Sequence, residues 1–216
     1  MNIYIVRHGK TVYNNEKRMQ GSSNSTLLPE SLAAAKSLGE AFAKEDITFD
    51  SVYSSDLIRT VHTAEKVLEG MNLDLDVKQV YNIREMDFGS AETKLIDDVW
   101  TTVAKNFGYD NAEHLLSNKE ANERLNLLHQ IEEYNDAEST SEFHARIIKG
   151  LDEVVSDAKE NDSKNVLIIA HGLTILGLLA QLGWEDLDTR SFDNLSVSLI
   201  NHSDDYKIKF VNKMYV

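Results

Sequence analysis

The chain has 216 residues, of which 42% are hydrophobic, and it carries a formal net charge of −14 at pH 7. This length fits one α/β domain with a sizeable core, whereas nucleic acids and anionic membrane surfaces require a basic face that so acidic a chain does not offer. Because there is no cysteine, disulfides, thiol nucleophiles and thiolate metal sites are excluded. No secretory signal precedes the first apolar run and no stretch is long enough to span a bilayer, so we expect one cytoplasmic domain over residues 1–216.

Short apolar runs, typical of buried strands, alternate with patterns that repeat every three or four residues, typical of helices. In chain order, strands are predicted at residues 3–6, 52–54, 77–81, 166–170, 195–200 and 206–211. Helices are predicted at residues 30–45, 56–69, 140–159 and 173–182. Pro29 and Ser55 are placed to begin the first two helices, and Gly70 is placed to end the second. This alternation predicts a three-layer α/β/α sandwich around a mostly parallel sheet, with the last two strands forming a hairpin.

Residues 92–137 interrupt the alternation of strands and helices. This region is acidic and contains helical patterns, so we interpret it as a helical insertion that covers one end of the sheet and not as a separate domain. Its aromatic side chains form either an apolar lid over a site or the insertion's own core: Trp100, Phe107, Tyr109 and Tyr134.

Two of the predicted strands end in the same pair of residues. His8-Gly9 follows the first apolar run, and His171-Gly172 follows the run at residues 166–170. Open α/β sheets build their sites at the carboxyl ends of strands, so we expect the two imidazoles to meet at one edge. Arg7 beside the first histidine indicates that the ligand is an anion.

These residue types fit phosphoryl transfer without a metal or a thiol, which needs a nucleophile, cationic donors and an acid. A neutral His8 can attack phosphorus if its other ring nitrogen donates to a fixed acceptor. Arg59 is predicted in the first turn of a helix, where its guanidinium and the helix N-terminus both face a phosphate. A protonated His171 would donate to the transferring oxygens, and Glu85, which follows the third strand, is the candidate acid.

Six groups of residues occur in a fixed order along nearly the whole chain. They are Arg7 to Thr11 with Asn14, Arg18, Gln20 and Gly21; Ser54 to Thr60 with Thr63 and Ala64; Arg84 to Gly89; Glu138, Ser139 and Arg146; Ile169 to Gly172; and Asn194 with Ser196. Together they resemble the motifs of the histidine phosphatase superfamily, in its phosphoglycerate-mutase-like branch. A lone Arg-His-Gly would be weak evidence, but the ordered set is strong.

The resemblance implies that His8 is phosphorylated during the reaction and that Glu85 is the proton donor. It also implies that the phosphoryl group or the rest of the substrate is held by Arg7, Asn14, Gln20, Gly21, Arg59, His171 and Gly172. No metal and no organic cofactor are implied, and the family fold is a three-layer sandwich. Three positions depart from the family pattern, since Ser31, Thr93 and Ala137 stand where glycine is usual.

The sequence is compatible with three functions. The first is metal-independent hydrolysis of a small phosphomonoester through a phosphohistidine, and the alternative is a cofactor-dependent phosphoglycerate mutase. The third is a phosphate-binding regulatory module without turnover. The resemblance implies that a mutase carries an extra basic cluster in the insertion, but its cations are scattered among acidic residues: Lys94, Lys105, Lys119 and Arg124. Hydrolysis of a small phosphorylated metabolite is therefore favoured. The sequence leaves open which metabolite this is, and whether the protein forms a homodimer.

Overall fold

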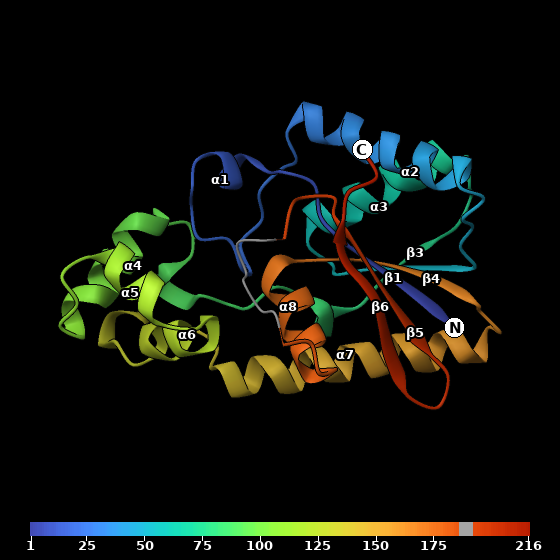
Figure 1. The fold of residues 1–216 in the computed structure, drawn as a ribbon. Coiled ribbons are helices and arrows are strands. Elements are labelled where there is room, and N and C mark those ends of the chain that lie inside the picture. Colours follow the sequence, from blue (N-terminus) through green and yellow to red (C-terminus); the bar gives the residue numbers. More distant parts are fainter. Residues whose placement is uncertain (186–191) are drawn as a thin grey trace.

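The computed structural model describes residues 1–185 and 192–216, and a six-stranded sheet in the order β3-β2-β4-β1-β5-β6 lies at its centre (Figure 1). The strands are β1 (Asn2–Arg7), β2 (Ser51–Ser54), β3 (Val77–Gln79), β4 (Asn165–Ala170), β5 (Val197–His202) and β6 (Tyr206–Lys213). The first four strands pair in parallel, whereas β5 pairs antiparallel with both β1 and β6. The predicted mostly parallel sheet and the final hairpin are confirmed.

Helices cover both faces of this sheet. The helices are α1 (Val12–Asn15), α2 (Pro29–Lys44), α3 (Ile58–Met71), α4 (Ile96–Asn106), α5 (Ala112–Asn118), α6 (Ala121–His129), α7 (Thr140–Glu160) and α8 (Gly172–Gln181). Helices α2 and α3 lie on one face, and α7 and α8 lie on the other (Figure 1). The predicted three-layer α/β/α sandwich is therefore confirmed.

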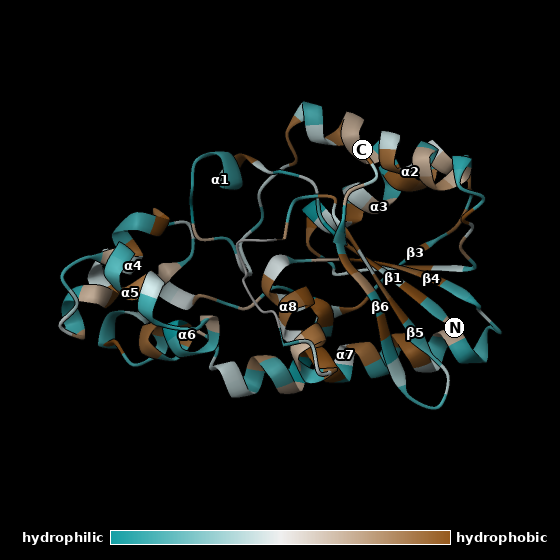
Figure 2. Cartoon of the chain, in the orientation of Figure 1, coloured by the Kyte–Doolittle hydropathy of each residue, from teal (hydrophilic) through white to brown (hydrophobic). Residues whose placement is uncertain are grey.

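The central strands are buried on both faces, which explains their continuous apolar runs. Along β1, Ile3 and Ile5 pack in the core beneath α7 and α8, whereas Val6 packs in the core beneath α2 and α3. Figure 2 shows hydrophobic strands between the two helical layers and a strongly hydrophobic α8. This double burial holds the carboxyl ends of β1 and β4 in a fixed position, and these ends carry the two His-Gly pairs.

Both ends of α3 differ from the prediction, because contacts with distant residues set them. Ser55, predicted to cap the helix, instead shares a 2.8 Å hydrogen bond with His171, and α3 begins two residues later than predicted. Gly70 does not end the helix, which runs on to a left-handed Asn72 with φ 53°. A Cβ atom on Gly70 would lie 2.0 Å from the carbonyl oxygen of Lys36 on α2, so this glycine permits the close approach of the two helices.

The third and fifth strands also differ slightly from the predicted ranges. Strand β3 ends at Gln79 because Tyr81–Ile83 form a 3₁₀ turn in place of the last predicted strand residues. Strand β5 begins at Val197, two residues later than predicted, since Leu195 has a left-handed backbone with φ 65°. These changes leave the sheet order and the placement of the histidines as expected.

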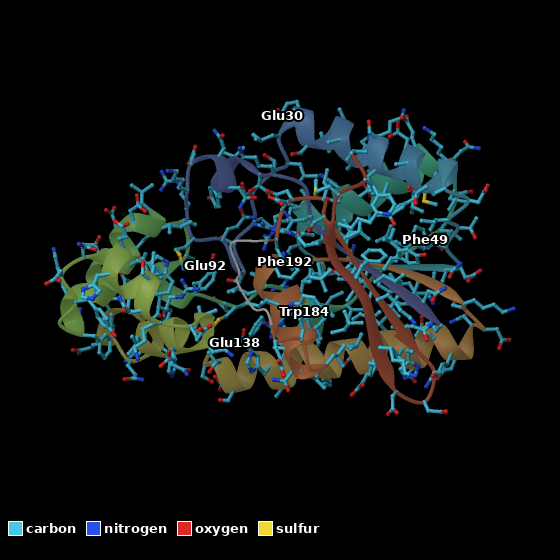
Figure 3. The ribbon with its side chains drawn as sticks, in the orientation of Figure 1. Glu30, Phe49, Glu92, Glu138, Trp184 and Phe192 are labelled. Atoms are coloured by element: carbon cyan, nitrogen blue, oxygen red, sulfur yellow. The ribbon has the colours of Figure 1, made fainter. Side chains whose placement is uncertain are left out.

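The region at residues 92–137 forms α4, α5, α6 and a 3₁₀ turn, which lie together beyond one end of the sheet (Figure 1). Its buried side chains, such as Val99 and Leu125, belong to the same core cluster as those beneath α7 and α8. Figure 3 labels Glu92 and Glu138, which mark where this segment leaves and rejoins the sandwich. Among the described residues, no helix combines the length and the apolar character needed to cross a membrane.

Candidate active site

The two histidines meet at the carboxyl edge of the sheet. Strands β1 and β4 are adjacent and parallel, and their register pairs Arg7 with Ala170. The next residue on each strand is therefore a histidine at the same level, and the rings of His8 and His171 lie with centroids 5.2 Å apart at an angle of 61°. The structure brings together the two imidazoles that the strand-end pattern singles out.

The local backbone sets the tautomer of His8. Its Nδ1 lies 2.7 Å from the carbonyl oxygen of Gly9, which can only accept, so Nδ1 carries the proton and Nε2 keeps a lone pair. Burial, and then the charges of Arg59 and Arg7, hold the pKa of His8 well below its usual range. The Asn194 amide nitrogen donates to the His8 carbonyl at 2.8 Å and fixes this turn from the other side. His8 is thus a neutral imidazole with one nitrogen free to act as a nucleophile.

Arg7 presents a buried donor that has no partner in the part of the chain that the structure describes. One terminal nitrogen, Nη1, donates to the carbonyl oxygen of Phe192 (labelled in Figure 3), whereas the buried Nε has no hydrogen-bond partner among the described residues. A Cβ atom on Gly172 would lie 3.6 Å from that Nε, so the glycine backbone packs directly beside the guanidinium. Because buried donors almost always have a hydrogen-bond partner, we expect an anion to bind at the Arg7 Nε.

Arg59 is fully buried, and its guanidinium donates hydrogen bonds to other residues of the protein. Its Nη1 donates to the carbonyl oxygen of Ser23 at 2.9 Å and its Nη2 to that of Gly21 at 2.7 Å. Its Nε lies 3.2 Å from Nδ1 of His171. Burial lowers the pKa of Arg59 to about 10, which leaves the guanidinium charged at neutral pH. Arg59 therefore holds the loop at residues 21–23 and orients His171.

His171 differs from the expected protonated donor. Since the Arg59 guanidinium only donates, Nδ1 of His171 accepts from it, and Nε2 donates to Oγ of Ser55 at 2.8 Å. Burial, and then the charge of Arg59, hold the pKa of His171 well below its usual range. His171 is accordingly neutral with both nitrogens in use, and a phosphate dianion beside it would raise its pKa again. Ser55, the partner that sets this tautomer, lies within one of the motif blocks but its role was not predicted.

Glu92 fixes the loop that holds Arg59, a role that the sequence did not reveal. Its carboxylate accepts hydrogen bonds from the backbone nitrogens of Gly21, Ser22 and Ser23 at 2.9 to 3.2 Å. A Cβ atom on Gly21 would lie 1.9 Å from the carbonyl oxygen of Met86, so only glycine fits there. Both backbone groups of Gly21 are used inside the protein, and its contribution to the site is to hold Arg59.

Gln20 and Asn14 lie at the mouth of the same site. With its side-chain oxygen facing Arg59, Gln20 accepts from Nε at 3.0 Å and Nη1 at 3.2 Å, while its amide nitrogen donates to Oγ1 of Thr11 at 2.6 Å. The Asn14 oxygen accepts from the backbone nitrogen of Thr11 at 3.1 Å, which orients that side chain as well. Both amides line a cavity together with Arg7, Glu85 and Gly172.

Glu85 is buried at the N-terminus of α8. Its Oε2 accepts from the backbone nitrogen of Leu173 at 3.0 Å, and its Oε1 accepts from those of Thr174 and Met86, both at 3.1 Å. Burial raises the pKa of Glu85, while the backbone amides of Leu173 and Met86 and the charges of Arg59 and Arg7 oppose that shift. Since Oε1 has more donors than Oε2, a proton is best accommodated on Oε2. The environment suits a carboxyl that gives up and regains a proton.

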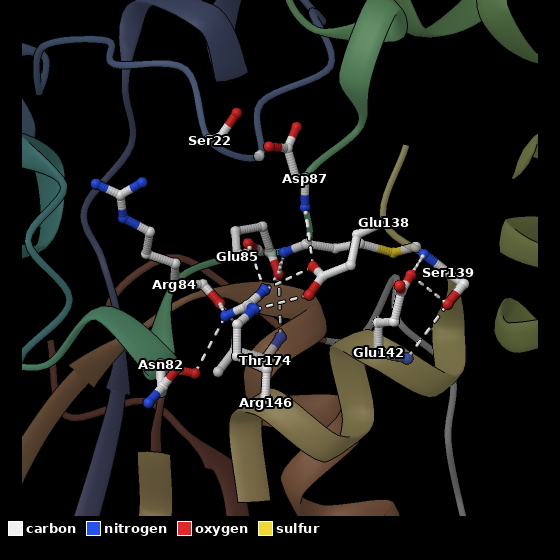
Figure 4. Close-up of polar contacts among 12 residues, drawn as sticks. Ser22, Asn82, Arg84, Glu85, Asp87, Glu138, Ser139, Glu142, Arg146 and Thr174 are labelled. Carbon is white, nitrogen blue, oxygen red and sulfur yellow. Dashed lines mark hydrogen bonds and ion pairs between the residues drawn. The ribbon is translucent and has the colours of Figure 1, made fainter. Parts of the chain in front are cut away.

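A partly buried ion pair positions the loop that carries Glu85 (Figure 4). Arg146 on α7 donates twice to the carboxylate of Glu138, each at 2.7 Å, and once each to the carbonyl oxygens of Asn82, Arg84 and Glu85 at 3.1 Å. Glu138 also accepts from the backbone nitrogen of Asp87 at 3.2 Å. One end of the loop is therefore held by Arg146 on α7 and the other by Glu138, which precedes α7. The sequence marked Glu138 and Arg146 as a structural block but did not connect them to the acid.

A cavity of about 420 Å³ lies next to these groups. Its polar lining comprises Arg7, Asn14, Arg18, Gln20, Glu85 and Arg124. Its apolar lining comprises Met19, Phe88, Ile96, Trp100, Leu116, Leu125 and Leu173, with Ala121 and Gly172. Of the four aromatic residues considered for a lid, Trp100 lines the cavity, whereas Tyr134 is buried in the core. Within residues 1–185 and 192–216, no three histidine or carboxylate side chains gather as ligands would around a metal ion.

Comparison with known proteins agrees with this geometry. Residues 3–213 match the histidine phosphatase superfamily (branch 1). A phosphoglycerate mutase from Bacillus anthracis str. Sterne is 31% identical and has a TM-score of 0.90, with 98% of this chain and 92% of that chain covered. A putative phosphoserine phosphatase 2 of Hydrogenobacter thermophilus is 29% identical over 216 residues, which cover 98% of this chain and 95% of the relative. A broad-specificity phosphatase of Saccharomyces cerevisiae is 25% identical, with 98% and 84% covered. The resemblance carried by the six motif blocks is confirmed, and the chain belongs to the histidine phosphatase superfamily.

Proposed function

We propose that this protein is a phosphatase that hydrolyses a small phosphomonoester through a phosphohistidine on His8. The observation that carries the proposal is the neutral His8, whose Nδ1 is held by Gly9 while Nε2 keeps its lone pair, beside the Nε of Arg7, for which the described residues offer no hydrogen-bond partner. A nucleophile and an anion-binding donor thus occupy adjacent residues at the end of one buried strand. No cofactor and no metal take part in the proposed reaction.

In the first step, the phosphate binds at Arg7 and Nε2 of His8 attacks phosphorus. A P–N bond forms while the P–O bond to the leaving alcohol breaks, and the alcohol oxygen takes the proton of Glu85. In the second step, the Glu85 carboxylate removes a proton from water as the water oxygen attacks phosphorus. The P–N bond breaks, phosphate leaves, and both His8 and Glu85 return to their starting states. Splitting a slow hydrolysis into two easier steps is the advantage of covalent catalysis.

The surroundings of Glu85 support both of its proposed roles. Burial favours the neutral acid before the first step, and the backbone amides of Leu173 and Thr174 stabilise the carboxylate after it. General acids work best when their pKa lies near the working pH, which requires such opposing influences for a glutamate. Arg59 supplies a fixed positive charge near both groups and keeps the loop at residues 21–23 in place.

A phosphoglycerate mutase is the alternative, and the names of relatives include both activities. A mutase must retain a second anionic group while its substrate reorients, and two of the cations considered for that purpose are engaged at the surface. Lys94 pairs with Glu133 at 2.6 Å, and Lys119 pairs with Glu123 at 3.0 Å. Of the four cations considered, Arg124 lines the cavity beside Arg7 and the three lysines do not, so they form no basic cluster there. These contacts favour hydrolysis over mutase activity.

A binding module without turnover is a weaker candidate, because the residues for a complete reaction are assembled at one site. We propose a small phosphorylated metabolite as the substrate, and no nucleic acid or membrane partner, in keeping with the charge of −14. The cysteine-free chain also fits the reducing cytoplasm that we propose as its location.

The proposal is tested by the turnover of p-nitrophenyl phosphate in EDTA by the wild type, His8→Ala and His114→Ala, from acidic to neutral pH. His114 lies on the exposed surface of the insertion and serves as a matched histidine control. Turnover that survives EDTA, disappears in His8→Ala and persists in His114→Ala supports the phosphatase. If the folded wild type shows no turnover but converts 3-phosphoglycerate when primed with 2,3-bisphosphoglycerate, the protein is a mutase. If it does neither, the binding module replaces both.

A further inference from the structure

The cavity extends far beyond the groups that touch a phosphoryl group. Arg7, Glu85 and Gly172 line one part of it, and side chains of the insertion line another, including Trp100 on α4 and Leu125 on α6. At about 420 Å³ it falls within the range of about 300–1,000 Å³ that is usual for sites of small organic ligands. A phosphoryl group and a water molecule would leave most of this volume to the leaving group of the substrate.

The wall of this extension is mainly apolar. Trp100 is only partly buried, whereas its neighbour Val99 is fully buried in the core, so α4 presents its tryptophan to the cavity and its valine to the interior. Leu173 places this apolar wall next to the proposed acid, because it lines the cavity and its backbone nitrogen donates to Oε2 of Glu85. A leaving oxygen that approaches Glu85 would therefore lie next to Leu173 at the edge of this apolar wall.

Two arginines of the lining, Arg18 and Arg124, contact other parts of the protein. Arg18 donates from Nε to the carboxylate of Glu16 at 2.6 Å and from Nη1 to the carbonyl oxygen of Thr93 at 2.8 Å. Arg124, which also lines the cavity, has its Nη1 3.4 Å from the carbonyl oxygen of Leu116. The positive charge of Arg18 is thus balanced locally by Glu16, which reduces its attraction for an anionic leaving group.

We infer that the preferred substrates are phosphomonoesters of apolar alcohols, with an alkyl chain or aromatic ring seated against Trp100 and Leu173. This inference rests on the proposed function and names its substrate class. Trp100 is the specificity-determining residue, since it contributes the largest apolar side chain to the wall. Burying one methylene group is worth about 0.8 kcal/mol, which corresponds to about a fourfold rise in kcat/KM for each carbon that enters the cavity.

The test compares primary alkyl phosphates of increasing length, from ethyl through butyl to hexyl phosphate, with O-phosphoserine and 3-phosphoglycerate. The alkyl alcohols have nearly equal acidity, so differences in kcat/KM report binding of the leaving group and not its chemistry. We expect a rise of tenfold or more from ethyl to hexyl phosphate in the wild type. Trp100→Ala should lose most of this rise, whereas Tyr109→Ala, an aromatic truncation in the same insertion outside the cavity, should keep it.

A second measurement needs no variant and guards against a Trp100→Ala protein that does not fold. Inhibition of the wild type by ethyl and hexyl phosphonate, which cannot be hydrolysed, should show the same preference for the longer chain. Equal or weaker inhibition by hexyl phosphonate, or higher kcat/KM for phosphoserine or 3-phosphoglycerate than for hexyl phosphate, would overturn the inference while leaving the phosphatase intact. Failure of the folded wild type to hydrolyse any of these esters or p-nitrophenyl phosphate would instead overturn the proposed function itself.

Discussion

Replacing Arg146 with methionine should destabilise the protein strongly and disturb the acid step. The side chains of Arg146 and Glu138 are only 16% and 13% exposed, so their ion pair is largely shielded from water. Methionine keeps an apolar stem of similar length but removes all five hydrogen bonds of the guanidinium, two to Glu138 and three to loop carbonyls. The loop that carries Glu85 then loses its three hydrogen bonds to the Arg146 guanidinium and keeps the one from Asn82 to Glu153 on α7.

The expected loss of unfolding free energy in Arg146→Met follows from the state in which this variant leaves Glu138. Glu138 would remain as a poorly solvated carboxylate whose remaining donor from the loop is the backbone nitrogen of Asp87. Breaking one side of a fully buried ion pair costs about 3–5 kcal/mol of unfolding free energy, chiefly because the remaining charge is stranded, and the partial exposure of this pair makes that figure an upper limit. Adding Glu138→Gln removes that charge, so the double variant should be less destabilised than Arg146→Met alone.

Urea unfolding of the wild type and variants measures these differences, with Lys149→Met as the control. Lys149 lies on the same helix, is 71% exposed in its side chain, and stands 4.0 Å from Glu153. Its replacement should change the unfolding free energy by no more than about 0.5 kcal/mol. A loss of less than about 1 kcal/mol in Arg146→Met, or a double variant as unstable as the single one, would refute this role of the ion pair. Where Arg146→Met remains folded, its turnover of alkyl phosphates should fall more than that of p-nitrophenyl phosphate.

Three further predictions concern the acid, a strained turn and the buried histidines. Glu85→Gln should abolish most activity on alkyl phosphates but less on p-nitrophenyl phosphate, whose leaving group needs little protonation, and equal losses on both esters would remove the proton-donor role. Wild-type activity on alkyl esters should fall as pH rises through the raised pKa of Glu85. Thr93 has a left-handed backbone with φ 65° where the family usually has glycine, so Thr93→Gly should raise the unfolding free energy by about 1 kcal/mol in urea titrations. The control Thr102→Gly, within α4, should lower the unfolding free energy. A lower unfolding free energy for Thr93→Gly would contradict the backbone strain. The buried His8 and His171 exclude protons that the unfolded chain binds below about pH 6.5, so acidification should reduce stability by up to about 1.4 kcal/mol per pH unit for each histidine. Urea midpoints at about pH 7.5 and about pH 5.5 should therefore differ less in His171→Gln than in the wild type, and equal differences would count against this assignment.

The sandwich and the meeting of the two histidines could be predicted because local patterns determine them. Strands β1 and β4 are apolar on both faces and each ends in His-Gly, and parallel neighbours place their carboxyl ends at one edge. The tautomer of His8 also depends on a local contact, since its acceptor is the next residue in the chain. The prediction of these features does not depend on the exact residues at which the helices begin and end.

Contacts between residues far apart in the chain escaped prediction. Glu85 binds the backbone of Leu173, 88 residues later, and Arg146 binds the carbonyl of Asn82, 64 residues earlier. The neutral state of His171 likewise depends on its burial against Arg59. No periodicity or motif spacing records such pairings, because they arise only when the layers pack.

The central claim, a covalent phosphohistidine on His8, is tested most directly by trapping the phosphoenzyme. Enzyme in excess over a substrate labelled at phosphorus would be mixed in EDTA and quenched in alkali, where a P–N bond survives, and the labelled residue would be located by peptide mapping. The account predicts transient label on His8 that is lost in acid and is absent from His8→Asn. Full turnover without any protein-bound label, or label that persists in His8→Asn, would contradict it.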